Sequence, residues 1–426
     1  MEKVYFKSRD VILSKKGNNY FMDGDKLTKE TYGEILNQKN VEDYRESDFD
    51  ALIRKYTHNF INQKFTNIVV LFGAGASVTD NRWDPDQRGI AKSGVTVASI
   101  AEKVCSNLEK GTYDLYGNEV SVFTLNDIAQ LSHYSDDILS KDDTNTDKLS
   151  ANFNLEDFLS NLFSYEKFVS EDQKEKLLNT KNSILDTIIK ATSYDFNKER
   201  FNHIKLLNIL SSFTKPENKL NLVTTNYDTL IEEAAETMKW TIFDGFSFSE
   251  TPKFDSTMFD WNLVKDVPNV KTNENIYKND VVNLLKIHGS LTWFKSSDNS
   301  IIRKNKGSGD ELPVMVFPSS DKYAKSYQEP YFDLFNKFQN LLQNPNTLLI
   351  TIGFSFADNH IARMILNAII TNDSLAILVT DYNIESTIDN WMELERLMKD
   401  YYNVAFLGTT LHSGLTEYLG DNINEN

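Results

Sequence analysis

The sequence has one cysteine and no long apolar run. Cys105 is the single cysteine in 426 residues, which excludes an internal disulfide and any zinc ribbon built from cysteines. No apolar stretch approaches the roughly 18 residues that a membrane-spanning helix needs. The first residues, MEKVYFKSRD, also lack the apolar core of a signal peptide. We therefore expect a cytoplasmic protein without membrane association.

Positive charge is also scarce. Lys and Arg together number 45 against 62 Asp and Glu, and the formal net charge is −17. Such a chain repels a polyanion at long range, so we expect no direct binding of nucleic acid over a broad surface. The hydrophobic fraction of 40% and the length of the chain suit a soluble protein with a large core.

Three regions differ in their residue pattern. Residues 1–49 include two short β-like runs around Lys-Lys-Gly-Asn, which is typical of a hairpin, so we expect an N-terminal extension. Residues 99–213 have mainly helical periodicity and predict a helical insertion. The segments 50–98 and 214–426 alternate strand-like and helical stretches. They predict one Rossmann-like domain.

Continuous apolar runs are typical of a parallel sheet that is covered on both faces. The sequence therefore predicts an α/β fold with a doubly wound, mostly parallel sheet. Residues 240–280 are too long for a simple connection, and we expect a functional loop there, such as a lid. The expected strands are 67–72, 220–225, 281–287, 313–317, 347–352, 375–380 and 403–407, and the expected helices are 50–65, 228–239, 331–342, 359–371 and 387–399.

A glycine-rich turn follows the first of these strands. The residues Gly73-Ala74-Gly75-Ala76-Ser77 stand directly after an apolar run. Such a junction lets backbone N–H groups approach a pyrophosphate at the start of a helix. A turn that serves only strand-to-helix packing also fits, because glycine adopts backbone angles that other residues cannot. The full dinucleotide fingerprint is not present, so the turn alone leaves both interpretations open.

Polar residues follow three more predicted strands, at the sheet edge where open α/β folds bind ligands. Each also has a structural explanation. Asn226 and Asp228 are suited to capping a helix, and so is Asp358, while His288 is suited to a place in the core. The stretches are TTNYD at 224–228, KIHGS at 286–290 and TIGFSFADNHI at 351–361.

Taken in order, these motifs resemble one family. Gly-Ala-Gly-x-Ser, Thr-x-Asn-x-Asp, His-Gly and Gly-x-Ser look like the sirtuin fold of NAD-consuming enzymes. GFSFADNHI and NLEDFLSNL resemble its bacterial anti-phage branch, and the resemblance spans roughly residues 66–380. It implies an NAD+ hydrolase that acts in anti-phage defence by depleting NAD+.

The departures from the family disfavour a protein deacylase. Deacylating sirtuins carry four zinc-binding cysteines, which one cysteine cannot supply. They also continue the first motif with Gly-Ile-Pro-Asp-Phe-Arg, whereas here Ser77 is followed by VTDNRWDPDQRGI.

Cleavage of the nicotinamide–ribose bond needs a site that stabilises an oxocarbenium-like transition state and places a water at C1′. Asn226 is suited to orient that water, because its amide both donates and accepts hydrogen bonds. His288 is suited to accept a proton near neutral pH. Asp228 would hold the nicotinamide carboxamide, as the resemblance implies. The remaining predicted contacts to NAD are Gly73, Ala74, Gly75 and Ser77 along the pyrophosphate and ribose, Gly353 and Ser355 on the other side, and Asp381 at the adenosine ribose.

Two other functions stay open. A metal-dependent nuclease needs clustered carboxylates, and the acidic stretch DDTNTD at 142–147 reads as solvated surface instead. A subunit that only senses NAD or ADP-ribose would not need both Asn226 and His288. We expect no metal cofactor.

An unrestrained NAD+ hydrolase would poison its host, and the sequence has no obvious sensor domain. We therefore expect a homo-oligomer that uses the N-terminal hairpin and the insertion. Related defence systems pair such a subunit with a HerA-like hexameric ATPase, and we expect such a partner by analogy.

Overall fold

The computed structural model describes residues 2–36, 46–63, 65–79, 97–134, 138–141, 147–150, 153, 155–266, 275–307, 312–315, 329–400 and 402–420. Most of the acidic stretch at 142–147 and of the segment after Ser77 lies outside these residues.

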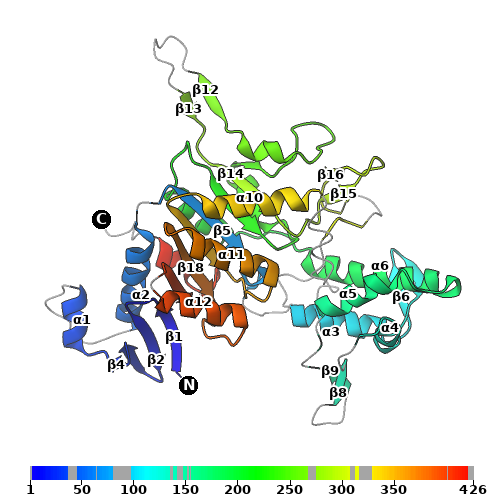
Figure 1. Cartoon of the computed structure of the whole chain (residues 1–426), viewed down its shortest axis with the longest axis horizontal. Helices are drawn as coiled ribbons and strands as arrows, with labels where there is room; N and C mark the ends of the chain where they lie inside the picture. The colour runs from blue at the N-terminus through cyan, green and yellow to red at the C-terminus, as the bar shows by residue number, and fades with distance from the viewer. Residues whose placement is uncertain are drawn as a thin grey trace.

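An eleven-stranded sheet forms the centre of the molecule, in the order β11-β14-β10-β5-β17-β18-β19-β1-β2-β3-β4 (Figure 1). The strands from β11 to β19 in this order run parallel, which confirms the predicted α/β fold with a mostly parallel sheet. They are β5 (Asn67–Phe72), β10 (Leu220–Thr224), β11 (Thr241–Phe243), β14 (Val281–Lys286), β17 (Thr347–Ile352), β18 (Leu375–Asp381) and β19 (Val404–Gly408).

The N-terminal strands continue this sheet. β1 pairs with β19 in the antiparallel direction, and the expected hairpin is formed by β2 and β3. These strands are β1 (Glu2–Lys7), β2 (Ile12–Lys16), β3 (Asn19–Met22) and β4 (Asp25–Lys26), followed by α1 (Lys29–Leu36).

Helices cover both faces of the sheet, which explains the unbroken apolar runs. In β5, Val69 and Leu71 belong to the core cluster shared with α10, α11 and α12, whereas Ile68, Val70 and Phe72 belong to the cluster shared with α2, α7 and α13. Both kinds of position are therefore buried, as a doubly wound sheet requires. The helices are α2 (Glu46–Ile61), α7 (His203–Ser211), α8 (Leu230–Thr237), α10 (Tyr331–Gln343), α11 (Asn359–Thr371), α12 (Asp389–Lys399) and α13 (Leu415–Leu419).

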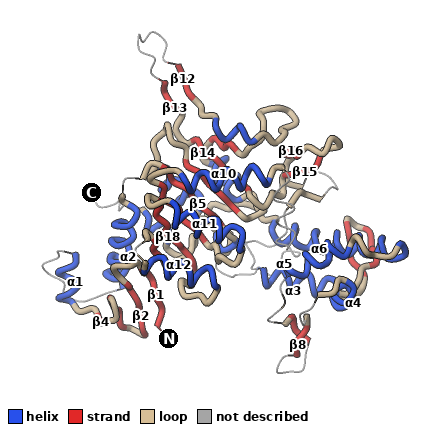
Figure 2. The backbone as a smooth tube through the Cα atoms, viewed as in Figure 1, coloured by secondary structure: helices blue, strands red, loops and turns tan. Residues whose placement is uncertain are grey.

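The residues from α3 to α6 form a body of mainly helical elements beside the sheet (Figures 1 and 2). This body has its own core, to which Val104, Ile128, Phe158 and Ile184 contribute. Helix α7 lies inside the range 99–213 but packs with the sheet. The elements of the body are α3 (Val97–Leu108), β6 (Thr112–Leu115), β7 (Asn118–Ser121), α4 (Leu125–Leu131), β8 (Leu139–Lys141), β9 (Asp147–Leu149), α5 (Leu155–Tyr165) and α6 (Lys174–Thr192).

The prediction of a sheet strand at 313–317 is wrong for the residues that the structure describes. Met315 forms only an isolated antiparallel bridge with Gly289. The strand at the sheet edge beside β14 is β11, which was not predicted from the sequence. Residues 316 and 317 lie outside the described residues.

The segment 240–280 holds more than a loop. It begins with β11 and continues through the 3-10 helix η3 (Ser256–Asp260), which buries Phe259. It then forms a hairpin of β12 (Val264–Asp266) and β13 (Asn275–Tyr277) that projects from the body of the molecule (Figure 1). A lid function for this segment stays a prediction.

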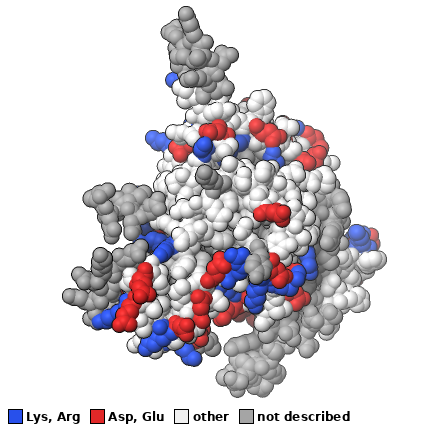
Figure 3. Space-filling model, turned by 60° about the vertical axis from the view of Figure 1, so that its left-hand side comes forward, with Lys and Arg blue, Asp and Glu red and all other residues white. Residues whose placement is uncertain are grey.

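Charge is mixed on the face drawn in Figure 3, where basic and acidic side chains lie next to one another. Within the part of the chain that the structure describes, no helix is both long enough and apolar enough to cross a membrane.

Candidate functional site

The glycine-rich turn packs against the end of the neighbouring strand β17. Gly75 N donates to Gly353 O at 3.0 Å, and Gly73 N donates to Ile352 O at 3.0 Å. A Cβ atom on Gly73 would lie 2.5 Å from Gly353 O. Gly353 has φ +61°, and a Cβ atom there would lie 2.5 Å from Ala76 N. Both positions therefore require glycine, because two backbones meet here without room for a side chain.

Most amide N–H groups of this turn already donate hydrogen bonds within the protein. Ala76 N donates to Gly73 O, Ser77 N to Ala74 O and Val78 N to Gly75 O, which forms a short 3-10 turn over Ala74–Ala76. Among the described residues, the N–H of the exposed Ala74 makes no backbone hydrogen bond. The glycines thus serve close packing first, and they offer a phosphate fewer donors than an open glycine loop would.

The end of β10 is hydrogen-bonded to this turn. The amide nitrogen of Asn226 donates to Gly73 O at 2.9 Å and to Ser77 Oγ at 3.0 Å. Both hydrogens of the amide are therefore committed to the protein. Among the described residues no hydrogen bond involves the carbonyl oxygen Oδ1 of the half-buried Asn226, so it can accept one from a water or a ribose hydroxyl.

Asp228 is anchored within the protein. Its Oδ2 accepts from Ser77 Oγ at 2.7 Å and from Tyr194 OH at 3.1 Å, and its Oδ1 accepts from Leu230 N at 3.1 Å. Burial, and then the charge of Asp228, raise the pKa of Tyr194 well above its ordinary value, so this hydroxyl remains a donor. The geometry favours an anchoring role for Asp228 over direct contact with the nicotinamide carboxamide.

His288 stands just beyond β14, next to β10 in the sheet, and is 6% exposed. Its Nε2 lies 3.3 Å from Asp358 Oδ2. Asp358 also caps α11, because its Oδ1 accepts from His360 N at 3.0 Å and from Ile361 N at 3.4 Å. The capping role that the sequence suggested is present, and the same carboxylate faces His288 as well.

The loop that carries Asp358 has an unusual backbone. The fully buried Phe356 has φ +59°, a conformation that costs free energy for a residue with a side chain. Asn390 of α12 donates to Phe356 O at 3.0 Å. This contact and the burial of the ring hold the loop in place beside His288.

Two predicted residues lie farther along the same sheet edge. Ser355 is exposed, and its Oγ accepts from Ala357 N at 3.4 Å. Asp381 is the last residue of β18, and burial raises its carboxyl pKa. No hydrogen bond joins either side chain to Asn226 or His288 among the described residues. Gly353 connects the glycine-rich turn with the end of β18, since its N–H donates to Thr380 O at 2.9 Å.

A buried lysine beside Asp228 was not predicted from the sequence. Lys286, 2% exposed, donates through Nζ to Asp228 O and pairs with Glu232 Oε1 at 2.9 Å. Burial raises the pKa of Glu232, and the nearby Lys286 opposes that rise. The position of Lys286 at the end of an otherwise apolar strand was the one feature of the sequence that could have indicated this role.

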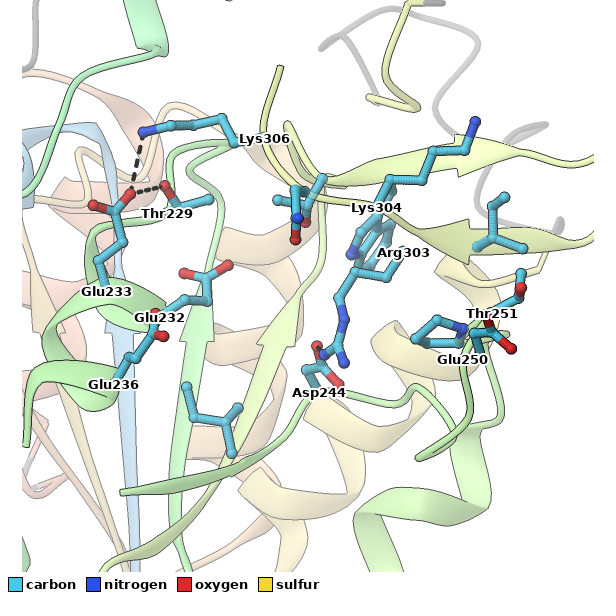
Figure 4. A pocket seen from close by; sticks show the side chains of 16 residues that line it. Thr229, Glu232, Glu233, Glu236, Asp244, Glu250, Thr251, Arg303, Lys304 and Lys306 are labelled. Atoms are coloured by element: carbon cyan, nitrogen blue, oxygen red, sulfur yellow. Dashed lines mark hydrogen bonds and ion pairs between the residues drawn. The ribbon is translucent and has the colours of Figure 1, made fainter. Parts of the chain in front are cut away.

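A cavity of about 710 Å³ is lined in part by residues of α8 (Figure 4). Glu232 and Glu233 line one wall, and Lys306 reaches across to Glu233 at 3.1 Å. The opposite wall includes Arg303, which pairs with Asp244. Arg303 comes from the hairpin of β15 (Trp293–Lys295) and β16 (Ile301–Arg303). None of the predicted site residues lines this cavity.

Comparison with known families supports a sirtuin-like fold. Residues 220–407 match the family model of a SIR2-like domain. The matched region runs from β10 almost to the end of β19 and includes Asn226, His288 and Asp358, whereas the glycine-rich turn lies before it. No curated protein matches the chain. The match supports an NAD-linked activity.

Proposed function

We propose that the chain is an NAD+ hydrolase that cleaves the nicotinamide–ribose bond and acts in anti-phage defence by depleting NAD+. The observation that carries the proposal is the fixed amide of Asn226, whose carbonyl oxygen is left for a water at the sheet edge where His288 also stands. The match to a SIR2-like domain supports NAD+ as the substrate.

The proposed reaction uses no group from outside the chain except water. The bond between C1′ and the nicotinamide nitrogen breaks, and its electron pair leaves with nicotinamide. The carbonyl oxygen of Asn226 accepts a hydrogen bond from the attacking water, whose oxygen forms the new bond to C1′. His288 takes the released proton, and Asp358 at 3.3 Å stabilises the resulting imidazolium.

The rest of the site supports this arrangement. Asp228, Ser77 and Tyr194 hold Asn226 in place through the shared hydrogen bonds. The Ala74 N–H and the surfaces of Gly75 and Gly353 would lie along the pyrophosphate. Ser355 and Asp381, farther along the edge, are the candidates for the adenosine end.

Incubation with NAD+ and chromatography of the products tests the proposal, and release of nicotinamide together with ADP-ribose is the expected result. Parallel incubations with labelled DNA and with an acetylated peptide test for a nuclease and a deacylase. The described residues hold no group of three His, Cys, Asp or Glu side chains placed to bind a metal ion. EDTA is expected to leave NAD+ cleavage unchanged, and a loss that Mg²⁺ restores would favour a metal-dependent enzyme.

We also propose a cytoplasmic homo-oligomer that is controlled by its assembly or, by analogy with related defence systems, by a HerA-like ATPase partner. Light scattering tests the oligomer on the intact chain. Removal of residues 1–45 is a poor test, because Phe6 and Leu13 are buried against the sheet and β1 covers the edge of β19. A monomer at micromolar concentration with full turnover would contradict the idea.

A further inference from the structure

We propose that His412 is a positioning residue that fixes the glycine-rich turn, and with it Asn226, for the reaction proposed above. His412 lies between β19 and α13, beyond the region that matches the SIR2-like domain. The inference rests on the proposed function for its kinetic consequences. Its structural consequence is independent of them.

Two hydrogen bonds define the state of the imidazole. Asn202 N donates to His412 Nδ1 at 3.3 Å, so Nδ1 carries no proton. His412 Nε2 lies 3.2 Å from Ala76 O, which can only accept. The neutral tautomer with its proton on Nε2 satisfies both contacts. His412 therefore donates to the same turn that the Asn226 amide binds.

The contact with Ala76 bears directly on the site. Ala76 is 1% exposed, and its own N–H donates to Gly73 O, the carbonyl that Asn226 also binds. The next residue, Ser77, supplies the second acceptor for the Asn226 amide. A shift of the Ala76 carbonyl would therefore move both acceptors that orient Asn226.

The surroundings of His412 keep the ring in place. It packs edge-on against Phe201, with ring centroids 5.8 Å apart at 70°. Asn202 also donates through Nδ2 to Leu411 O at 3.1 Å. The segment before α13 is thus attached to the start of α7, and the imidazole spans from there to the turn.

Two variants separate a hydrogen-bonding role from simple filling of space. His412→Leu introduces an apolar side chain of similar size and removes both hydrogen bonds. His412→Gln keeps one N–H donor and one carbonyl acceptor, so it can replace both. For His412→Leu we expect kcat/KM for NAD+ to fall about tenfold or more, and for His412→Gln we expect it to return within about threefold of the original chain. Thermal melting confirms that both variants are folded at the assay temperature.

Hydrogen exchange of the amides in residues 73–78 supplies a readout that does not depend on activity. The positioning role predicts that these amides exchange about fivefold faster or more in His412→Leu than in the unsubstituted protein. In His412→Gln their exchange rates should be close to those of the unsubstituted protein. Unchanged exchange in His412→Leu, or a folded His412→Gln as impaired as His412→Leu, would overturn it. If the original chain releases no nicotinamide, the proposed function fails, while the exchange experiment still decides the role of His412.

Discussion

The hydroxyl of Ser77 donates to a carboxylate oxygen of Asp228 at 2.7 Å and joins two distant parts of the chain. Ser77 follows β5, whereas Asp228 follows β10, the strand beside it. The same hydroxyl accepts from the Asn226 amide at 3.0 Å, so the orientation of Asn226 depends on this pair. Asp228 therefore organises the site from within the protein.

Replacing Asp228 with Ala should destabilise the fold. The change leaves the donors of Ser77, Tyr194 and Leu230 without their buried acceptor, which costs at least about 3 kcal/mol. Urea denaturation measures the loss. Asp195→Ala is the matched control, because the side chain of Asp195 is 99% exposed and pairs with Lys306 at 3.4 Å. Equal denaturation midpoints for the two variants would show that the network contributes nothing.

Gly353→Ala should destabilise the fold more than Gly17→Ala, although the two glycines have nearly the same φ angle. Gly17 has φ +60° with open space around it, so a methyl group costs only the backbone strain of about 1 kcal/mol. Gly353 has φ +61° and would place its methyl group 2.5 Å from backbone atoms of Gly75. We expect a clearly larger loss of thermal stability and loss of NAD+ cleavage for Gly353→Ala alone. Similar behaviour of the two variants would refute the close packing of the turns.

Acid should destabilise the protein through His203. Burial, and then the neighbouring His412, lower the pKa of His203 from 6.5 to about 3. The unfolded chain therefore binds a proton below pH 6.5 that the folded protein excludes. The stability from this group is complete above pH 6.5 and falls by about 1.4 kcal/mol per pH unit toward pH 3.

The variant His203→Phe removes this titration. Its free energy of unfolding, measured with urea at pH 7 and pH 5, should fall by about 2 kcal/mol less than that of the original chain. Identical pH dependence in both proteins would mean that His203 is not buried in its neutral form.

Asp358→Asn separates the two tasks of this side chain. Asparagine caps a helix about as well as aspartate, so α11 should be retained and the melting temperature should change little. The negative charge that faces His288 is lost, and we expect kcat for NAD+ cleavage to fall about tenfold or more. Turnover equal to that of the original chain would restrict Asp358 to capping.

The sequence predicted the central strands closely because both faces of the sheet are buried. The bounds of β5 and β17 match the predicted 67–72 and 347–352, where unbroken apolar runs allow little ambiguity. β11 was missed because three residues carry too weak a pattern. The run at 313–317 has a strand-like composition, but β11 occupies the edge beside β14.

The candidate site could be predicted from the sequence only where its residues follow a strand. Asn226 and His288 stand at strand ends, so the fold class alone placed them on one edge. Tyr194 and His412 reach the site from segments with no such pattern, after α6 and after β19. Their contacts with Asp228 and Ala76 arise from tertiary packing that no local sequence signal encodes.

Nicotinamide release from NAD+ by the original chain, Asn226→Ala and His288→Ala tests the central claim most directly. Chromatography of the products and a thermal melt of each protein are measured side by side. The account predicts nicotinamide and ADP-ribose from the original chain, and a fall of at least about 100-fold in each folded variant. Turnover at the original rate in either folded variant, or no nicotinamide from the original chain, would contradict it.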